Sequence, residues 1–218
     1  HNKRERGEAL CDRIEAGECG VLVTDAGMPA ISDPGEDLVA LCHRRGIPVT
    51  AVPGPTAMAT ALALSGLAVG RFTFEGFLST ANRSRREHLQ SLKSERRTMV
   101  FYEAPHKLLS TLEDLLAALG DRRLTLAREL TKLHEEVRCT TLAEAVEWYA
   151  ANPPRGEFVL VVEGAPEEEK TEQSPEDALA LARRYVAEGA SASEAAKRAA
   201  AETGRRKGEI YKQLTTEE

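Results

Sequence analysis

The sequence lacks the motifs that would place it in several common protein classes. No Gly-x-Gly-x-x-Gly follows a strand-like segment and no Gly-Lys-Ser/Thr loop occurs, which argues against dinucleotide dehydrogenases, the common Rossmann-type methyltransferases and P-loop enzymes. No apolar run approaches the roughly 20 residues of a membrane span, and no secretory signal peptide is visible. The five histidines do not cluster with acids or cysteines at ligand spacing, so we expect no metal site.

Cysteine and aromatic residues are scarce, and acidic residues outnumber basic ones. Cys11, Cys19, Cys42 and Cys139 show no Cys-x-x-Cys spacing and lie in helix-like and strand-like contexts, which predicts buried, reduced thiols in a cytoplasmic protein. The net charge of −6 argues against non-specific binding to nucleic acid, although basic residues can still gather on one face. The few aromatic residues predict no broad platform for stacking bases.

One stretch, residues 21–35, organises the rest of the chain. Residues 21–24 form a short apolar run typical of a buried parallel strand. The run breaks at Asp25-Ala26-Gly27, where a glycine lets the backbone pass close to another group. A helix is expected next, with Asp33 as its N-cap and Pro34 in its first position. A connection this long at the carboxyl end of a parallel strand is where open α/β sheets hold ligands.

Residues 48–66 repeat this pattern. Residues 48–52 are typical of the next strand, Pro53-Gly54-Pro55-Thr56-Ala57 turns the chain, and a helix of small residues is expected to end at Ser65-Gly66. Helix N-termini after such loops offer free N–H groups to a carboxylate or a hydroxyl. The two loops predict a ligand cleft; the alternative is a pair of stiff connections that bind nothing.

The remaining pattern predicts a second α/β domain, a linker and a helical module. Strands are expected at residues 71–78, 98–102, 124–129, 135–140 and 158–162, the third and fourth adjacent and antiparallel, and helices at 3–16, 84–92, 105–119 and 142–151. Residues 69–165 would then form a domain with a mixed sheet. Residues 166–173 are an acidic linker with nothing to bury, and residues 174–218 are similar to a helix-turn-helix module.

Several motifs together resemble one family. They are Asp25 to Pro29, Ser32-Asp33-Pro34-Gly35, Pro53 to Ala57, Phe101 to His106, Ala127 to Lys132, and Gly156-Glu157 before the run 159–164. This pattern resembles the tetrapyrrole methylase superfamily and, more narrowly, the bacterial small-subunit ribosomal RNA methyltransferase I family. The resemblance covers nearly all of the chain. It implies an α/β class III methyltransferase fold, with two α/β domains, a cofactor cleft between them and a small C-terminal helical module.

The resemblance also indicates which part of the first domain the sequence contains. Family members begin with a strand and a Pro-x-Gly-Asn type loop that this sequence does not contain, so residues 1–68 would be the later part of the first domain.

The function implied is S-adenosylmethionine-dependent 2′-O-methylation of a cytidine ribose in 16S ribosomal RNA, in the decoding centre of the small subunit, by a homodimer. Such a transfer needs the methyl group held in line with the attacking oxygen, so orientation supplies much of the acceleration.

The cofactor-binding residues that the resemblance implies lie in the two loops and after two strands of the second domain. They are Asp25, Ala26, Gly27, Met28, Pro29, Ser32, Asp33, Thr56, Ala57, Tyr102, Arg128 and Leu130. Ordinary helix-start chemistry explains Thr56-Ala57 equally well.

Three residues are candidates for catalysis. A ribose hydroxyl is a poor nucleophile until its proton leaves, and a positioned carboxylate or amine that accepts the proton typically contributes about 10²–10⁴-fold. Glu103, Glu129 and Lys132 follow predicted strand ends and have suitable groups. The alternative is that Glu103 and Glu129 form structural ion pairs with Arg128 or Lys132.

Two basic clusters are candidates for phosphate contacts with RNA. They are Arg83, Arg85 and Arg86 in the second domain, and Lys197, Arg198, Arg205, Arg206, Lys207 and Lys212 in the helical module. A solvated helix face is the usual explanation of such runs. The position of the second cluster, in a small helical module after a linker, favours RNA docking.

Two other functions stay open at this point. A precorrin-type tetrapyrrole C-methyltransferase would share the first two domains, and methylation of a porphyrinoid in vitro would identify it. A non-catalytic fragment for dimerisation and RNA binding is the third hypothesis, and a test of S-adenosylmethionine binding separates it from the first.

Overall fold

The chain forms two compact units, residues 1–165 and residues 166–218. The structure, a computed structural model, describes residues 2–166 and 175–216. Each unit encloses apolar clusters of its own.

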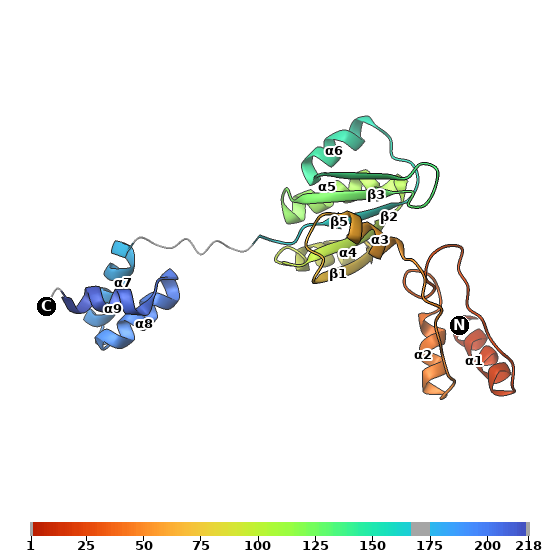
Figure 1. Cartoon of the computed structure of the whole chain (residues 1–218), viewed down its shortest axis with the longest axis horizontal. Coiled ribbons are helices and arrows are strands. Elements are labelled where there is room, and N and C mark those ends of the chain that lie inside the picture. The colour runs from red at the N-terminus through yellow and green to blue at the C-terminus, as the bar shows by residue number, and fades with distance from the viewer. Residues whose placement is uncertain (1, 167–174, 217–218) are drawn as a thin grey trace. The chain divides into compact units, whose positions relative to one another are not determined.

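A five-stranded mixed sheet is the centre of the first unit (Figure 1). In chain order its strands are β1 (Phe72–Phe77), β2 (Thr98–Glu103), β3 (Arg123–Arg128), β4 (Glu136–Thr141) and β5 (Phe158–Val162). Their order in the sheet is β1-β2-β5-β3-β4; β1 and β2 are parallel, and the other neighbours are antiparallel. All five residues of β5 are buried, because the strand is central and both of its faces are covered.

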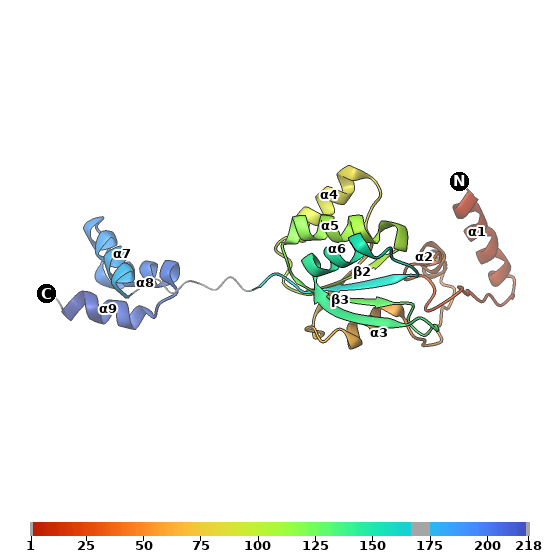
Figure 2. The ribbon, with the colours of Figure 1, turned by 90° about the horizontal axis from the view of Figure 1, so that it is seen from above.

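Helices cover the two faces of the sheet unequally (Figure 2). One face carries three helices, whose leucines form the main core with Phe101 and Leu160. Among the described residues, a single helix covers the opposite face, where Ala61 and Leu62 pack with Val100 and Val161. The three helices are α4 (Asn82–Ser91), α5 (Leu108–Leu119), preceded by the short 3-10 turn Pro105–Lys107, and α6 (Leu142–Ala151); the single helix is α3 (Ala57–Leu64).

Two further helices of the first unit, α1 (Asn2–Glu15) and α2 (Glu36–Arg44), pack against each other. Their contact is a small buried cluster of Cys11, Leu41, Cys42 and Ile47. Cys11 and Cys42 are therefore buried as predicted, whereas Cys19 and Cys139 are exposed, which corrects the prediction for those two thiols.

Most elements predicted from the sequence are confirmed. Every strand expected between residues 71 and 162 is present within two residues of its predicted bounds, and β3 and β4 are adjacent and antiparallel. The helix of small residues is α3, which ends at Ser65. The helix expected at residues 105–119 is the 3-10 turn with α5, and Gly120 ends it.

The two strands predicted before residue 60 are wrong. Residues 18–24 and 47–52 join no sheet, and Val21, Val23 and Val52 are 83%, 78% and 87% exposed. An apolar, β-branched run becomes a strand only where a neighbouring strand supplies its hydrogen bonds. Within the described residues, no strand lies beside either run.

The start of α2 also differs from the prediction. Its N-cap is Gly35, with a φ of 147°, and not Asp33. A Cβ atom at Gly35 would lie 2.5 Å from Leu22 Cδ2, so this entry to the helix requires glycine. The chain bends through residues 29–35 before the helix begins, which leaves the Asp33 side chain exposed.

Three helices form the second unit: α7 (Pro175–Ala187), α8 (Ala192–Thr203) and α9 (Lys207–Thr216). Their core consists mainly of small side chains, including Ala182, Ala196 and Ala199, which let the helices approach closely. Ser191 caps α8 by accepting the Glu194 N–H, as its spacing predicts, and Gly204 ends that helix with a φ of 75°. The predicted linker, apart from Pro166, lies outside the described residues.

Candidate functional site

The candidate residues of the second domain lie along one edge of the sheet. β1, β2 and β3 run in the same direction, because β5 is antiparallel to both β2 and β3. The register places Phe77 beside Tyr102, and Glu103 and Arg128 on either side of Phe158. The carboxyl ends of three strands therefore meet at this edge, where α/β proteins commonly bind ligands.

Tyr102 joins this edge to the start of α3. Its Oη accepts a hydrogen bond from the Met58 N–H at 3.0 Å, and its ring meets Phe74 and Phe77 edge to face, with centroids 5.1 and 5.6 Å apart. Burial, and to a lesser degree the charge of Asp33, raises the pKa of the tyrosine hydroxyl. The hydroxyl therefore keeps its proton at neutral pH and can donate it to a ligand.

The structure brings the two Gly/Pro loops together. Gly27 has a φ of 74°, and a Cβ atom placed on it would lie 3.7 Å from the Pro55 carbonyl oxygen. Thr56 caps α3, since its Oγ1 accepts the Ala59 N–H at 3.2 Å, so its helix-start role is present. Of the other predicted loop residues, Asp25, Ala26, Ser32, Asp33 and Ala57 are exposed, and Met28 and Pro29 are half-buried.

Glu103 is held on the opposite face of the sheet from Tyr102. Neighbouring residues of a strand point to opposite faces, so Tyr102 faces α3 and Glu103 faces α5. Glu103 is only 3% exposed, and its two carboxylate oxygens accept the Ala104 N–H at 2.9 Å and the Thr111 hydroxyl at 2.6 Å. This arrangement is typical of a carboxylate that positions other groups.

The turn between β3 and β4 is the most strained part of the site. Glu129 and Thr131 have φ values of 51° and 67°, in the left-handed region that side chains with a Cβ rarely adopt. Glu129 Oε1 accepts the Glu157 N–H at 2.9 Å and the Lys132 ammonium at 3.0 Å. The Lys132 ammonium also contacts Glu157 Oε2 at 3.0 Å. Residues in such conformations often mark functional sites.

Hydrogen bonding fixes the charges of this turn. The Glu157 N–H and then the Lys132 ammonium lower the pKa of Glu129. The Glu129 and Glu157 carboxylates raise the pKa of Lys132. At neutral pH the pair is therefore a carboxylate and an ammonium. The ion pair between Glu129 and Lys132, one of the alternatives considered from the sequence, is present.

Arg128 and Leu130 lie on different sides of the edge. Leu130 packs on the apolar cluster beneath α3, together with Met58 and Tyr102. Arg128 instead pairs with Glu136 at 3.2 Å, and its Nε is buried without a hydrogen-bond partner among the described residues. Leu130 and Tyr102 are thus brought together, and Arg128 is not brought to the same side.

The structure also adds residues that the sequence analysis missed. Phe74 and Phe77 enclose Tyr102, and the alternation of apolar residues in their strand could have indicated this. Gly156 lets the Glu129 side chain lie close to its backbone, because a Cβ at that position would overlap Glu129 Cγ. No local pattern in the sequence indicates this contact. Leu133, at the tip of the turn, is 93% exposed.

The basic residues of α4 are engaged within the protein. Arg83 pairs with Glu87 at 2.8 Å, and Arg85 with Asp114 at 2.6 Å. Arg86 Nε donates to the Asn82 carbonyl oxygen at 3.4 Å.

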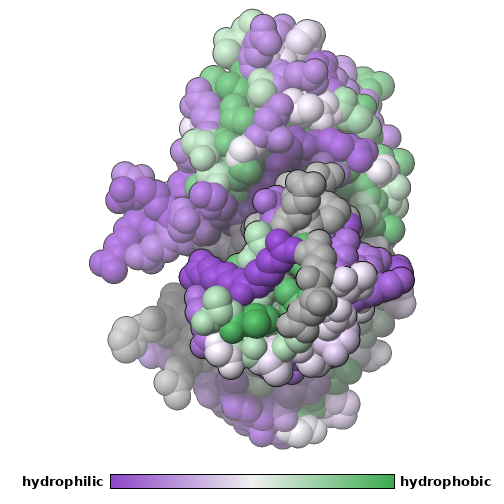
Figure 3. Space-filling model, turned by 90° about the vertical axis from the view of Figure 1, so that its left-hand side faces the viewer, coloured by the Kyte–Doolittle hydropathy of each residue, from purple (hydrophilic) through white to green (hydrophobic). Residues whose placement is uncertain are grey.

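The helical unit carries exposed cations of a different kind. Lys197, Arg206 and Lys212 are exposed, and their side chains have no ion-pair or hydrogen-bond partner within the described part of the chain. Lys207 donates to Ser193 Oγ at 3.1 Å and Arg198 lies 3.5 Å from Glu194, while Arg205 is half-buried. Figure 3 shows hydrophilic side chains on the face of this unit that is turned toward the viewer, interspersed with apolar and near-neutral residues.

The described residues, 2–166 and 175–216, lack a metal-binding cluster and a helix that could span a membrane. These residues contain no group of three or more His, Cys, Asp or Glu side chains placed to bind a metal ion. None of their helices combines the length and the apolar character that crossing a membrane requires.

Comparison with known proteins gives the family. The profile of the family described as Tetrapyrrole (Corrin/Porphyrin) Methylases matches residues 1–146. A Synechocystis protein named ribosomal RNA small subunit methyltransferase I is 47% identical over 218 residues, which is 100% of this chain and 78% of the relative. A Pseudomonas aeruginosa protein of the same name is 44% identical over 98% of this chain and 76% of its own length.

Solved structures agree on the fold. The methyltransferase CobJ superposes with a TM-score of 0.56 at 22% identity, over 74% of this chain and 71% of CobJ. A uroporphyrin-III C-methyl transferase from Thermus thermophilus, complexed with S-adenyl homocysteine, gives 0.50 at 18% identity over 72% of each chain. The strand ends, the paired loops and these matches lead to one assignment: the chain belongs to the tetrapyrrole methylase family of methyltransferases, and within it to the group named ribosomal RNA small subunit methyltransferase I.

Proposed function

We propose that the protein transfers a methyl group from S-adenosylmethionine to the 2′-hydroxyl of a cytidine in 16S ribosomal RNA of the small ribosomal subunit. The observation that carries this proposal is the extent of the match. The Synechocystis relative aligns with all 218 residues, including the helical unit, whereas the tetrapyrrole methylase profile ends at residue 146. A substrate that uses the helical unit therefore fits the chain better than a tetrapyrrole does.

The residues at the paired loops fit such a cofactor. Bound S-adenosylmethionine supplies an electrophilic methyl group on a positively charged sulfur. We assign its binding to the loop residues 25–29, with Ser32 and Asp33, and to Thr56 and Ala57 at the start of α3. Gly27 leaves the backbone open to a ligand, and the protonated Tyr102 hydroxyl, beside Leu130, donates to no group within the described residues. Arg128 instead contacts Glu136 and the His134 carbonyl oxygen, so we assign it no direct contact with the cofactor.

The turn after β3 is the proposed place where the ribose hydroxyl is oriented for attack on the methyl group. The lowered pKa of Glu129 makes it a weak base, so its contribution is mainly to orient the hydroxyl and accept its hydrogen bond. The Lys132 ammonium beside it is suited to a neighbouring RNA phosphate. Glu103 is proposed as a positioning residue, because it is buried on the face opposite Tyr102 and each of its oxygens already accepts a hydrogen bond.

The helical unit is the proposed RNA-docking module. Lys197, Arg206 and Lys212 are exposed cations without partners among the described residues, so a phosphate contact breaks no ion pair within the chain. Arg83, Arg85 and Arg86 are weaker candidates, since each would first have to leave its present partner.

We further propose a homodimer that works in the cytoplasm. The exposed side chains of Val21, Val23 and Val52 form apolar surface that a second copy of the chain could cover. Light scattering at micromolar concentration checks this assembly, and a monomer at every concentration contradicts it.

A comparison of two substrates in separate reactions tests the proposed function. The protein is incubated with S-adenosylmethionine labelled in its methyl group and with either small-subunit ribosomal RNA or uroporphyrinogen III. We expect label in the RNA alone. Label in the porphyrinoid alone would establish the tetrapyrrole alternative, and a chain that binds the cofactor product but labels neither would contradict both.

A further inference from the structure

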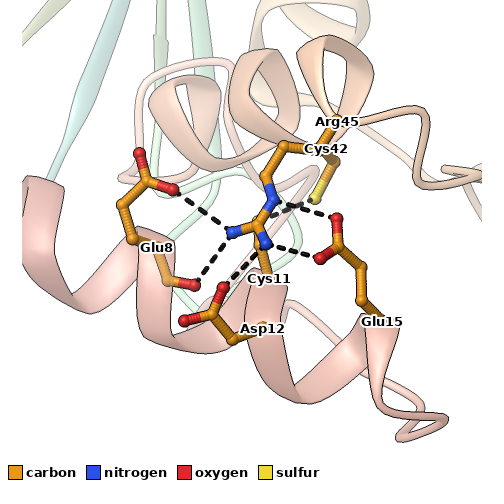
Figure 4. A network of polar contacts seen from close by, with 6 residues as sticks. All are labelled: Glu8, Cys11, Asp12, Glu15, Cys42 and Arg45. Atoms are coloured by element: carbon orange, nitrogen blue, oxygen red, sulfur yellow. Dashed lines mark hydrogen bonds and ion pairs between the residues drawn. The ribbon is translucent and has the colours of Figure 1, made fainter.

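A pair of buried thiols lies outside the proposed site. Cys11 of α1 and Cys42 of α2 face each other with 3.8 Å between their Sγ atoms, and the two residues are 0% and 6% exposed (Figure 4). A disulfide requires a sulfur–sulfur distance of about 2.05 Å. The two sulfurs must therefore approach by only about 2 Å, which is within the reach of side-chain rotation.

Arg45 holds the two helices in the register that aligns the sulfurs. Its guanidinium reaches three carboxylates on one face of α1, as Figure 4 shows. The contacts are Nη1 to Glu8 Oε2 at 3.2 Å, Nη2 to Asp12 Oδ1 at 2.7 Å, and Nε to Glu15 Oε1 at 2.9 Å. These ion pairs join α1 to the end of α2 beside the thiols, and so they keep Cys11 opposite Cys42.

We propose that Cys11 and Cys42 are a modification site that exchanges with a low-molecular-weight disulfide of the glutathione class to form an intramolecular disulfide. The thiolate of Cys42, the less buried of the two, attacks the reagent disulfide and releases one thiol. Cys11 then attacks the mixed disulfide and releases the second thiol. Two cysteine thiols are oxidised, one reagent disulfide is reduced, and the two cysteine protons end on the released thiols.

The environment of Cys11 determines its protonation, and the positions of the two cysteines determine what a disulfide between them would constrain. Burial and the contact with Cys42 raise the pKa of the Cys11 thiol, so Cys11 stays protonated at neutral pH and Cys42 is the thiol that attacks first. The bond would join both ends of residues 12–41. If the proposed function holds, this segment includes the loop that we assign to the cofactor, so the bond would restrict that loop.

The test uses the full chain with Cys19→Ser and Cys139→Ser, which keeps only the two buried thiols. The protein is equilibrated with oxidised and reduced glutathione, quenched in acid, alkylated and digested with trypsin and a glutamate-specific protease. Cleavage separates residues 9–13, which contain Cys11, from residues 37–44, which contain Cys42. We expect one cross-linked pair of these peptides and an intact mass lower by two hydrogens.

A matched control and a reference state make the result decisive. The same chain with Cys11→Ser should form only a glutathione adduct at Cys42. The ratio of cross-link to mixed disulfide should be at least roughly tenfold higher in the native protein than in denaturant, because the fold raises the effective concentration of one thiol near the other. Glutathione adducts without a cross-link, or a ratio no higher in the native state, would overturn the proposal. Neither measurement depends on cofactor or RNA.

Discussion

Replacing Tyr102 separates the two roles that the structure gives to this side chain. Tyr102→Phe keeps the edge-to-face contacts with Phe74 and Phe77 but removes the oxygen that accepts the Met58 N–H. One such hydrogen bond contributes about 0.5–1.5 kcal/mol, and water can reach the half-buried Met58, so we expect about 1 kcal/mol lower free energy of unfolding. Tyr102→Leu also removes two aromatic pairs worth about 0.5–1.5 kcal/mol each, so it should cost about 2–4 kcal/mol.

The same two variants test the cofactor assignment. Loss of the donor in Tyr102→Phe should weaken binding of S-adenosylhomocysteine by about five- to tenfold in calorimetry, since about 1.4 kcal/mol corresponds to tenfold. Urea unfolding measures the stability change in parallel. Equal stability for the two variants would refute the role of the aromatic pairs. Unchanged affinity in Tyr102→Phe, with the expected loss of stability, would remove the hydroxyl from the cofactor site.

Three further predictions concern other parts of the chain. Gly156→Ala should lower the free energy of unfolding by at least about 1–2 kcal/mol, because φ is 79° at this position and a Cβ would overlap the Glu129 side chain. The loss should be smaller when Glu129→Ala has already removed that side chain. Equal losses with and without Glu129→Ala would refute the contact. Hydrogen bonds from Arg97 lower the pKa of Glu95 from 4.5 to about 2, so this carboxylate stabilises the protein above pH 4.5 and the contribution disappears as the pH falls toward 2. In Glu95→Gln, the free energy of unfolding should therefore fall less between pH 4.5 and pH 2, by on the order of 1 kcal/mol once screening by water is included. The same pH dependence in the variant and the parent would contradict the pairing of Glu95 with Arg97. Replacing Lys197, Arg206 and Lys212 together by alanine should weaken RNA binding and reduce the slope of log affinity against log salt concentration by about 0.7–0.9 for each phosphate no longer bound. Arg83→Ala is the control, because Arg83 is paired within the protein. Equal slopes for the triple variant and the parent would indicate that these cations only contact solvent.

Local pattern predicted the sheet well where the partners of each strand lie within the chain. Residues 158–162 and residues 21–24 have similar apolar, β-branched composition, yet only the first segment is a strand. The difference is the neighbouring strand: Phe158 to Val162 are paired on both sides, whereas nothing within the described residues pairs with Val21 to Thr24. Composition predicts what a segment does beside a partner, and it does not reveal whether the partner is there.

The candidate site was predictable to a similar extent. The two Gly/Pro loops and Tyr102 could be selected from motifs, and the structure brings Gly27 near Pro55 and Tyr102 near α3. The opposite placement of Glu103 follows from strand alternation once the bounds of β2 are known. The contact of Glu129 with Gly156 joins two loops distant in sequence, so only the folded chain reveals it.

The most direct test of the proposed function asks which atom receives the methyl group. Small-subunit ribosomal RNA without prior modification is incubated with the protein and with S-adenosylmethionine carrying a deuterated methyl group. The RNA is then digested to nucleosides for mass spectrometry, and a second portion is subjected to alkaline cleavage. We expect the label on the ribose of cytidine, and a single position resistant to alkali, because a methylated 2′-oxygen cannot attack the adjacent phosphate. Label on a base, or RNA that alkali cleaves at every position, would contradict ribose methylation.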